Sequence, residues 1–451
     1  MDTGLLRASI WADMPAPARI AAFNILLRVE REQAYAVELL HSASMDKLSE
    51  ADRNLTTEIV MGVLRWRLLL DQQIAQFSFT PFAKLDLEVV TALRMGAYQI
   101  MFLSRVPSHA AVNETVELVK QGRKTSAAGL ANAVMRKILA QHKSGKRISN
   151  QRTPAEVFAH PDWLVQRWMQ QFGSDVALKI CDYDQQVPET VLRLSSATDD
   201  DTLCCENVEL TSGVLMKNAR RVIAGDVTRT SLFRDARVAI QDEGSQLVAA
   251  LVGRGRRILD CCAAPGGKTA ALATRFPEAE IVAAELHAHR ARLLRRMAPQ
   301  QNVQVLTADA LQLPFAAEFE RVLADVPCSG TGTLARNPEI KWRLKPIDIP
   351  DLHARQVSIL RAAMKHATGG GRVIYSTCSL EPEENEDVVA ECLEDNTDFH
   401  LIPVAEELDH LRNSGEVIWP DVATLVKGEF LRTIPGVHPC DGFFAAILER
   451  Q

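Results

Sequence analysis

The sequence predicts a protein of several domains: an all-α N-terminal domain, a small α+β middle domain and a C-terminal α/β domain built on a doubly wound sheet. Apolar residues recur at helical spacing from residue 17 to about residue 140. The polar, basic stretch "HKSGKRISNQRTP" then interrupts that pattern and is typical of a linker. From about residue 236, strand-like and helical runs alternate, which favours a parallel sheet covered by helices on both faces. The predicted domains are residues 1–145, a basic linker at 146–154, residues 155–235 and residues 236–451.

The first two domains are predicted from short patterns. In "ARIAAFNILLRVE", Ile20, Phe23 and Leu27 share one helix face. Further helices are predicted in "LTTEIVMGVLRWRLLLDQQIAQF", "LEVVTALRMGAYQIMFL" and "PSHAAVNETVELVKQG". In the middle domain, "HPDWLVQRWMQQF" indicates an amphipathic helix, while "ETVLRLSS" and "RVIAGDVTRTSLF" indicate strands.

In the C-terminal domain, predicted strands and helices alternate regularly. Strands are predicted in "RRILDCCAA", "AEIVAAEL", "VQVLTAD", "RVLADVPC" and "GRVIYSTC". Helices are predicted in "KTAALATRF", "AHRARLLRRMA" and "ARQVSILRAAMKHA". Sheets of this kind bind ligands beyond the carboxyl ends of their strands. Every motif described below falls at such a strand end.

Composition excludes several classes of protein. The chain is 47% hydrophobic and 24% charged, which is ordinary for a globular protein. No apolar run reaches the ~18–20 residues of a membrane helix, and the first residues lack the pattern of a signal peptide. The nine cysteines contain no CxxC pair, so we expect free thiols and no metal site. These features predict a cytoplasmic protein.

Charge is distributed unevenly along the chain. The net charge is −6, but residues 1–152 contain 20 Lys/Arg and 14 Asp/Glu, a net of +6. Nine basic residues and no acidic ones lie between Lys120 and Arg152. Such a run is usually a solvated helix face followed by a linker. It could also contact the phosphates of a nucleic acid, and the run alone does not decide between the two.

The stretch "ILDCCAAPGGKTA" predicts a strand, a tight turn and the start of a helix. A phosphate-binding P-loop would need glycine at Cys262, and the GxGxxG pattern of dinucleotide folds is absent. The remaining interpretation is the nucleoside-binding first loop of S-adenosylmethionine enzymes. Glu285 could accept hydrogen bonds from two ribose hydroxyls, and Asp309 could meet an adenine amino group. Either carboxylate alone could equally be a helix cap or a surface residue.

Two lone thiols follow later strands. Cys328 lies in "RVLADVPCSGTGT" and Cys378 in "RVIYSTCSLEPEENE". An isolated cysteine at a strand end is usually a small buried hydrophobic residue. Two such turns in series favour exposed, activated thiols. The residues alone do not distinguish the role of one thiol from that of the other.

These motifs resemble a known family. "CCAAPGGKT", "DVPCSGTGT", "PEIKW", "YSTCSLEPEENE" and "DGFFAAIL" are similar to RNA cytosine-5 methyltransferases, over roughly the last half of the chain. "MGVLRWRLLLDQQI", "LRMGAYQI", "PSHAAVNETVEL" and "GLANAVMRKIL" resemble the NusB RNA-binding fold. The combination, with "HPDWLVQRW" and "QDEGSQLVA", resembles the bacterial 16S ribosomal RNA cytosine-5 methyltransferases. It implies a Rossmann-like methyltransferase domain, S-adenosylmethionine as methyl donor and 16S ribosomal RNA as partner.

The resemblance also implies roles for individual residues. Cys378 would be the nucleophile, Cys328 would assist breakdown of the covalent adduct, and Asp325, if protonated, could donate to cytosine N3. The family usually has Asp at Glu285 and Ala at Val326, so the ribose contact would come from a longer side chain. The cofactor site would comprise Cys262, Ala263, Ala264, Pro265, Gly266, Gly267, Lys268, Glu285, Asp309 and Asp325. Candidate phosphate contacts are Arg290, Arg292, Arg336, Lys341, Arg343 and Lys345.

Other functions stay open at this point. A transfer RNA target is one, although the NusB-like domain favours 16S ribosomal RNA. A DNA cytosine methyltransferase would use the cysteine of the "PC" motif and lack the second thiol, so Cys378 argues against it. A non-catalytic RNA-binding or antitermination factor would bind no S-adenosylmethionine. We expect a monomer that uses no metal and does not associate with a membrane.

Overall fold

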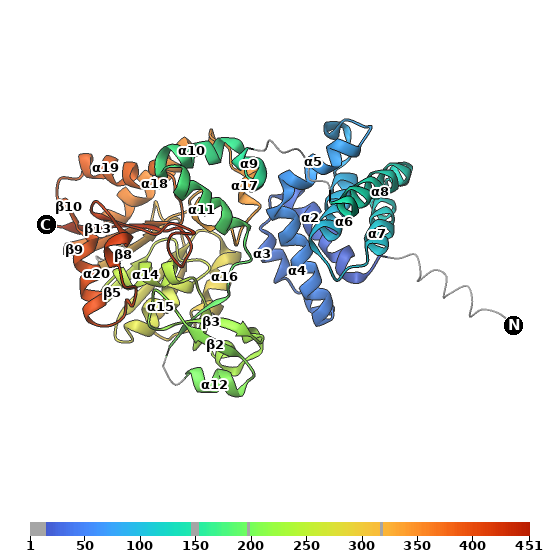
Figure 1. The fold of residues 1–451 in the computed structure, drawn as a ribbon. Coiled ribbons are helices and arrows are strands. Elements are labelled where there is room, and N and C mark those ends of the chain that lie inside the picture. Colours follow the sequence, from blue (N-terminus) through green and yellow to red (C-terminus); the bar gives the residue numbers. More distant parts are fainter. Residues whose placement is uncertain (1–14, 146–152, 196–198, 316–318) are drawn as a thin grey trace. The chain divides into compact units, whose positions relative to one another are not determined.

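The computed structural model describes residues 15–145, 153–195, 199–315 and 319–451 (Figure 1). It contains two compact units. The first comprises the chain up to Gln186 together with Leu334–Arg343, and the second comprises Val187–Thr333 and Leu344–Gln451. Among the described helices, none combines the length and apolar character needed to span a lipid bilayer.

The first unit is helical, as predicted. The central helix α6 is buried along most of its length, and α2, α4, α7 and α8 pack around it (Figure 1). Gly62 of α4 permits this close packing, because a Cβ there would lie 1.9 Å from the Tyr98 ring. The helices are α2 (Pro17–Glu32), α3 (Ala36–Leu40), α4 (Glu50–Arg65), α5 (Arg67–Phe77), α6 (Leu87–Phe102), α7 (Ser108–Gln121) and α8 (Ala128–Ser144).

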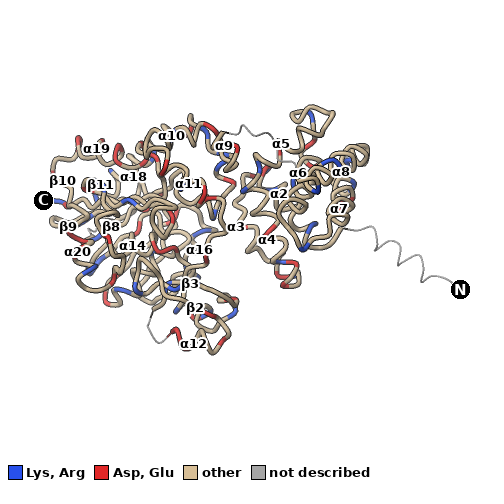
Figure 2. Tube along the Cα trace, viewed as in Figure 1, with Lys and Arg blue, Asp and Glu red and all other residues tan. Residues whose placement is uncertain are grey.

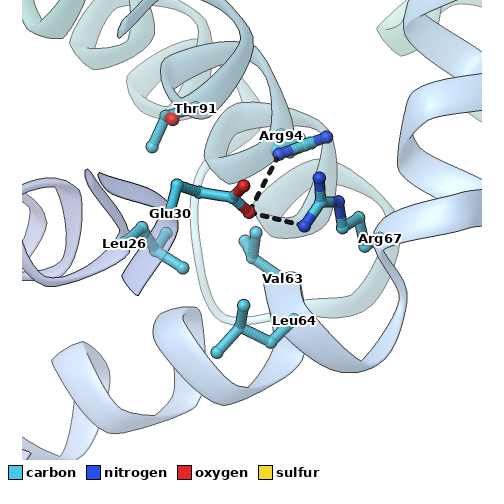
Figure 3. A pocket seen from close by; sticks show the side chains of 7 residues that line it. All are labelled: Leu26, Glu30, Val63, Leu64, Arg67, Thr91 and Arg94. Carbon is cyan, nitrogen blue, oxygen red and sulfur yellow. Dashed lines mark hydrogen bonds and ion pairs between the residues drawn. The ribbon is translucent and has the colours of Figure 1, made fainter. Parts of the chain in front are cut away.

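A small polar pocket lies among these helices (Figure 3). Glu30 accepts a hydrogen bond from Arg67 at 2.5 Å and forms an ion pair with Arg94 at 3.7 Å. Arg94 also donates to Asp71 at 2.6 Å. The two cations and two carboxylates neutralise one another, so this pocket offers no uncompensated charge to a ligand.

Three further helices belong to the first unit: α9 (Pro154–Val157), α10 (Asp162–Phe172) and α11 (Ser174–Gln185). Helix α10 confirms the predicted amphipathic helix. Gln72 of α5 donates to Glu156 at 3.0 Å, and Gln185 donates to the Arg65 carbonyl at 3.3 Å. The compact units therefore divide the chain at Gln186, whereas the sequence suggested boundaries near 155 and 235. The predicted linker falls largely on residues 146–152, outside the described residues.

Figure 2 colours the Lys and Arg residues of the first unit blue and its Asp and Glu residues red. Contacts with acidic residues compensate part of the basic stretch. Lys120 donates to Glu117 at 2.6 Å, and Lys124 pairs with Asp86 at 3.1 Å. Lys137 lies 4.0 Å from the ring centroid of Phe79, whose side chain is largely exposed. Lys146, Arg147 and Arg152 lie outside the described residues. An RNA-contact role for this stretch stays a prediction.

The segment Leu334–Arg343, which contains the "PEIKW" motif, packs within the first unit and ends in the short helix α17 (Ile340–Arg343). Lys341 donates to the carbonyls of Arg65 at 3.0 Å and Ala159 at 3.1 Å, and Trp342 donates to the Leu64 carbonyl at 2.7 Å. Lys341 is 1% exposed, so the expectation that it contacts phosphate is wrong. Its ammonium instead satisfies buried backbone carbonyls.

The buried Lys341 should make stability depend on pH. Burial lowers its pKa from 10.5 to about 7, although Asp184 opposes this effect. Between these two values the unfolded chain binds a proton that the folded chain does not, so stability rises with pH. We expect the free energy of unfolding to increase by about 2–3 kcal/mol from pH 7 to pH 9.5. Urea unfolding should show that Lys341→Met loses this increase; an unchanged pH dependence would contradict the assignment.

The second unit begins with a small antiparallel sheet of order β2-β3-β1-β4. Strands β1 and β3 confirm the two predicted strand-bearing segments. The short helices α12 and α13 accompany the sheet. The elements are β1 (Val191–Leu194), α12 (Asp199–Cys205), β2 (Glu209–Ser212), β3 (Ala219–Ala224), α13 (Ser231–Arg234) and β4 (Val238–Ile240).

The main sheet has the order β11-β12-β13-β9-β8-β5-β6-β7, and β10 pairs with β13. Strands β5 to β9 are parallel, as predicted. Strands β10 to β13 pair in antiparallel fashion, so the sheet is mixed rather than wholly parallel. The strands are β5 (Arg257–Asp260), β6 (Glu280–Glu285), β7 (Val303–Thr307), β8 (Phe319–Asp325), β9 (Ala367–Thr377), β10 (Phe399–Ile402), β11 (Val426–Lys427), β12 (Phe430–Arg432) and β13 (Phe444–Arg450).

Helices cover both faces of this sheet (Figure 1). Neighbouring residues of β5 point to opposite faces: Ile258 packs with α14, α15 and α20, whereas Leu259 packs with α18 and α19. This arrangement confirms the doubly wound fold. The helices are α14 (Glu243–Leu251), α15 (Gly267–Arg275), α16 (Ala288–Met297), α18 (Asp348–Met364), α19 (Glu386–Asp395) and α20 (Val404–Asn413).

Candidate active site

The residues predicted to form a site follow the carboxyl ends of the five parallel strands. Because parallel strands end at the same edge of a sheet, this places them along one edge of the second unit. The loop Cys262–Lys268 follows β5, Glu285 ends β6 and Asp309 follows β7. Asp325 ends β8, Cys328 lies in the loop after it, and Cys378 follows β9. In the order β9-β8-β5-β6-β7, the thiols follow β8 and β9, and the predicted cofactor residues other than Asp325 lie at the ends of β5, β6 and β7.

The loop after β5 makes a tight turn into α15. The Ala263 amide donates to the Ala284 carbonyl at 2.9 Å, which holds the loop against β6. Gly266 has a φ of 118° and caps α15. A Cβ at Gly266 would lie 2.9 Å from the side chain of Leu294, so the turn requires glycine. The first helical turn therefore presents backbone amides at the site edge.

Asp260, at the end of β5, was not predicted from the sequence as a site residue. It is 1% exposed, and its Oδ2 accepts a hydrogen bond from Thr269 at 2.7 Å. Its Oδ1 has no partner among the described residues. Burial raises the pKa of Asp260 to about 7, against the hydrogen bond from Thr269. Its position directly before the glycine turn is a signal that could have identified it.

Glu285 and Asp309 differ in their surroundings. Glu285 is 5% exposed, and its Oε1 accepts a hydrogen bond from the His287 amide at 2.9 Å. Its second oxygen has no partner among the residues that the structure describes. Asp309 is exposed and accepts from the Leu311 amide at 3.0 Å. Leu311 and Leu286 expose apolar surface next to these carboxylates.

Asp325 connects the two halves of the site. Its Oδ2 accepts from Lys268 at 2.8 Å and its Oδ1 from Ser376 at 2.8 Å. Burial lowers the pKa of Lys268, but Asp325 outweighs it and the pKa is raised. Lys268 is therefore a cation, and it also lies 5.1 Å from the ring centroid of Phe443. The role of Ser376, in the "YSTC" motif, was not predicted from the sequence.

The two thiols face each other. The Sγ atoms of Cys328 and Cys378 are 3.4 Å apart. The hydrogen bond to Cys378, together with burial, raises the pKa of Cys328 well above its ordinary value. Either sulfur can be the donor of the hydrogen bond between them. The negative charge of a Cys378 thiolate also contributes to the raised pKa of Lys268, so this cation lies within its electrostatic reach.

The buried carboxylate of Glu384 joins the two cysteine loops. It accepts from the Ser329 amide at 2.8 Å and from the Ser379 hydroxyl at 2.5 Å, and Ser329 also donates its hydroxyl to it. Gln356 of α18 donates to Glu384 at 2.8 Å and to the Pro327 carbonyl at 3.0 Å. The sequence placed Glu384 only within a motif and gave it no role.

Backbone contacts also connect the two cysteine loops. The Gly332 amide donates to the Cys378 carbonyl at 2.9 Å, and the Gly442 amide donates to the Gly332 carbonyl at 2.7 Å. A Cβ at Gly332 would lie 2.3 Å from the Gly442 carbonyl oxygen. Gly332 of the "SGTGT" motif is therefore required by its contact with the backbone of Gly442, in the segment before β13. The loops that carry the thiols are held as one rigid element.

A Rossmann-like sheet whose parallel strands end in a glycine turn, an acidic series and a joined thiol pair defines a methyltransferase domain, here joined to a NusB-like helical domain. Residues 251–449 match the 16S rRNA methyltransferase RsmB/F family, and residues 16–140 match the NusB family. The chain belongs to the RsmB/F family.

Relatives match along nearly the whole chain. "Probable ribosomal RNA small subunit methyltransferase B" of Bacillus subtilis (strain 168) is 31% identical, over 96% of this chain and 98% of that protein. "Ribosomal RNA small subunit methyltransferase B" of Pseudomonas putida is 33% identical, over 88% of this chain and 92% of that protein. The crystal structure of PH0851 has the same fold, with a TM-score of 0.78 at 21% identity, over 97% of this chain and 100% of that chain.

Proposed function

We propose that the protein transfers a methyl group from S-adenosylmethionine to carbon 5 of a cytosine in 16S ribosomal RNA, through a covalent bond between Cys378 and the base. The observation that carries this proposal is the thiol pair, 3.4 Å apart, beside the Lys268–Asp325 ion pair. Relatives named for methylation of small-subunit ribosomal RNA support the substrate class.

The residues present suit an S-adenosylmethionine ligand. The second oxygen of Glu285 can accept hydrogen bonds from a ribose diol, and the exposed leucines beside Glu285 and Asp309 suit a flat base. The Oδ1 of Asp260 is buried with no partner in the described part of the chain, next to a loop whose turn requires glycine at Gly266. We propose that the loop Cys262–Lys268 with Glu285, Asp309 and Asp325 holds this cofactor. When bound, S-adenosylmethionine supplies an electrophilic methyl group.

The thiol pair suits the chemistry of cytosine. Carbon 5 is a poor nucleophile until a thiolate adds to carbon 6 and converts the ring into an enamine. A Cys378 thiolate lies within electrostatic reach of the Lys268 cation, so we assign the attack to Cys378. Asp325, fixed by Lys268 and Ser376, is placed to organise protons at the edge of the base.

The final step requires a different group. After methylation the carbon 5 proton must leave and the bond between Cys378 and carbon 6 must break. Cys328 is the neighbouring sulfur, and we propose that it assists this elimination. Because a base within an RNA helix cannot reach such a site, the target cytosine must be unpaired or flipped out. The helical first unit would supply affinity for RNA rather than chemistry.

A direct test incubates the purified protein with labelled S-adenosylmethionine and either unmodified 16S ribosomal RNA or transfer RNA. Mass spectrometry of nucleosides should find 5-methylcytosine in the 16S sample, and bisulfite sequencing should locate it at a defined position. Methylation of transfer RNA alone would assign the other target. Absence of any methylated product would leave a non-catalytic RNA-binding protein.

The cofactor site can be tested with a matched pair on one strand. Glu285→Ala removes the buried carboxylate at the end of β6 and should weaken S-adenosylmethionine binding by about 1–3 kcal/mol. Glu280→Ala, at the start of the same strand, removes an exposed carboxylate and should bind normally. Isothermal calorimetry measures both. Equal affinities for the two variants would exclude Glu285 from the site.

A further inference from the structure

A second cavity lies in the second unit, between the small antiparallel sheet and helices α14 and α15. Four charged residues line it: Arg193 from β1, Lys217 from the connection between β2 and β3, Arg275 from α15, and Glu416. The mechanism proposed above uses none of these residues. Their charges and contacts indicate what the cavity binds.

Arg193 is a buried cation with no carboxylate partner among the described residues. It is 7% exposed, and its Nε donates to the neutral amide oxygen of Gln241 at 2.9 Å. It forms no ion pair with any residue that the structure describes. Burial lowers its pKa to about 10, so it keeps its charge at neutral pH. A buried guanidinium usually has an anionic partner, because desolvation of an unpaired charge is costly.

The other charges do not supply that partner. Glu416 is paired with Arg275, with an Nη2–Oε1 distance of 2.9 Å and a second hydrogen bond from Nη1. Lys217 is exposed at the cavity and forms no ion pair among the described residues. Arg193 and Lys217 are therefore two cations whose charge is not balanced. The cavity is suited to an anion with several acceptor oxygens.

Gln241 connects Arg193 of the cavity lining to the loop proposed to hold the cofactor. Gln241, which accepts from Arg193, has its amide nitrogen 3.7 Å from the position of a Cβ at Gly267. Ala271 and Arg275 continue along α15 from Gly267 at helical spacing and line the cavity. A ligand bound here would approach the active site from the side of the small sheet.

We propose that this cavity binds a phosphodiester group of the RNA substrate near the target cytosine, with Arg193 and Lys217 as its ligands. The proposal rests on the RNA methyltransferase function given above. The planar guanidinium of Arg193 can bind phosphate oxygens in a fork, and Lys217 can follow the backbone from the rim. The contact would hold the strand while the target base enters the site.

The test measures the dissociation constant for a 16S ribosomal RNA fragment at several KCl concentrations. Each lost phosphate contact lowers the slope of log K against log [salt] by about one. Lys217→Ala removes an exposed side chain and should lower the slope by about this amount. Arg193→Gln should lower it as well, with folding checked by circular dichroism. Lys365→Ala removes an exposed lysine between α18 and β9 that does not line the cavity; it is the control and should leave the slope unchanged.

Five outcomes separate the interpretations. Reduced slopes for both variants, with normal S-adenosylmethionine affinity, would support the proposal. The phosphodiester proposal would be overturned if Lys217→Ala and folded Arg193→Gln kept the wild-type slope. If the wild type still methylated RNA, the proposed function would stay intact. The proposal would also be overturned if the variants lost affinity for S-adenosylmethionine instead of RNA. It would likewise be overturned if inorganic phosphate stabilised the wild type while the variants bound RNA normally. A wild-type protein that methylates no RNA would refute the proposed function itself.

Discussion

Replacing Cys378 with alanine is expected to abolish methyl transfer, by about 10⁴-fold or more as for other catalytic nucleophiles. The Cys328→Ala variant should instead attack the base and methylate it, but release it slowly. On a denaturing gel with labelled 16S RNA and S-adenosylmethionine, Cys328→Ala should accumulate a covalent protein–RNA adduct. The Cys378→Ala variant and the double variant should form none.

The geometry explains the asymmetry. The two sulfurs are 3.4 Å apart, and the Lys268 cation lies within electrostatic reach of a Cys378 thiolate, so we assign the attacking electron pair to Cys378. Addition needs only this nucleophile and an activated ring, whereas elimination needs removal of the carbon 5 proton and a correctly held leaving sulfur. Without Cys328 the first half of the reaction can proceed and the second half stalls.

Cys204→Ala is the matched control, because Cys204 is an exposed thiol on α12 of the same unit. It should methylate and release RNA like the wild type. An adduct that forms with Cys378→Ala and disappears with Cys328→Ala would reverse the assignment. It would give the protein the order of thiols found in DNA cytosine methyltransferases.

The sequence predicted the fold well where local pattern and tertiary structure agree. Strand-like runs ending in Asp260, Glu285 and Asp325 lie in neighbouring parallel strands, as their alternation with helices indicated. Burial on both faces gives such strands continuous apolar runs, which can be recognised locally. The antiparallel β13 has a similar run, "FFAAIL", and its direction depends on chain connections that local pattern does not encode.

Contacts between distant residues could not be predicted. Lys341 lies in a basic, polar-looking motif, yet it is buried because the carbonyls of Arg65 and Ala159 require donors. The same limit applies to Arg193, which looked like an ordinary strand residue. Its significance depends on the cavity formed by β1, α14 and α15. The types of residue at the strand ends were predictable, but their hydrogen-bonding partners were not.

Glu384 shows how such partners create a site. Each cysteine loop is short and rich in small residues, so neither is rigid alone. The carboxylate of Glu384 accepts hydrogen bonds from Ser329 of one loop and Ser379 of the other. It therefore fixes the distance between the thiols without contacting either sulfur. We expect Glu384 to be a positioning residue.

The Glu384→Ala variant should lose both stability and activity. It leaves several buried donors without an acceptor, so the free energy of unfolding should fall by about 3 kcal/mol or more. Methyl transfer should fall by about 10²-fold or more, because small displacements of reacting groups are costly. Glu384→Gln should recover most of both, since its oxygen can accept from Ser329 and Gln356 while the serine hydroxyls rotate to accept from its nitrogen.

A thiol-specific measurement separates positioning from general stability. Diamide, a thiol oxidant, converts two nearby thiols into a disulfide and is itself reduced. With each protein folded, as shown by circular dichroism, diamide should link Cys328 to Cys378 rapidly in the wild type, in Glu384→Gln and in the neighbouring Glu383→Ala. Linkage should be slow in Glu384→Ala, because its loops no longer hold the sulfurs in contact range. If Glu384→Ala oxidised and methylated as fast as the wild type, the carboxylate would only fill the interior, and the main chain around Gly332 and Gly442 would set the thiol distance.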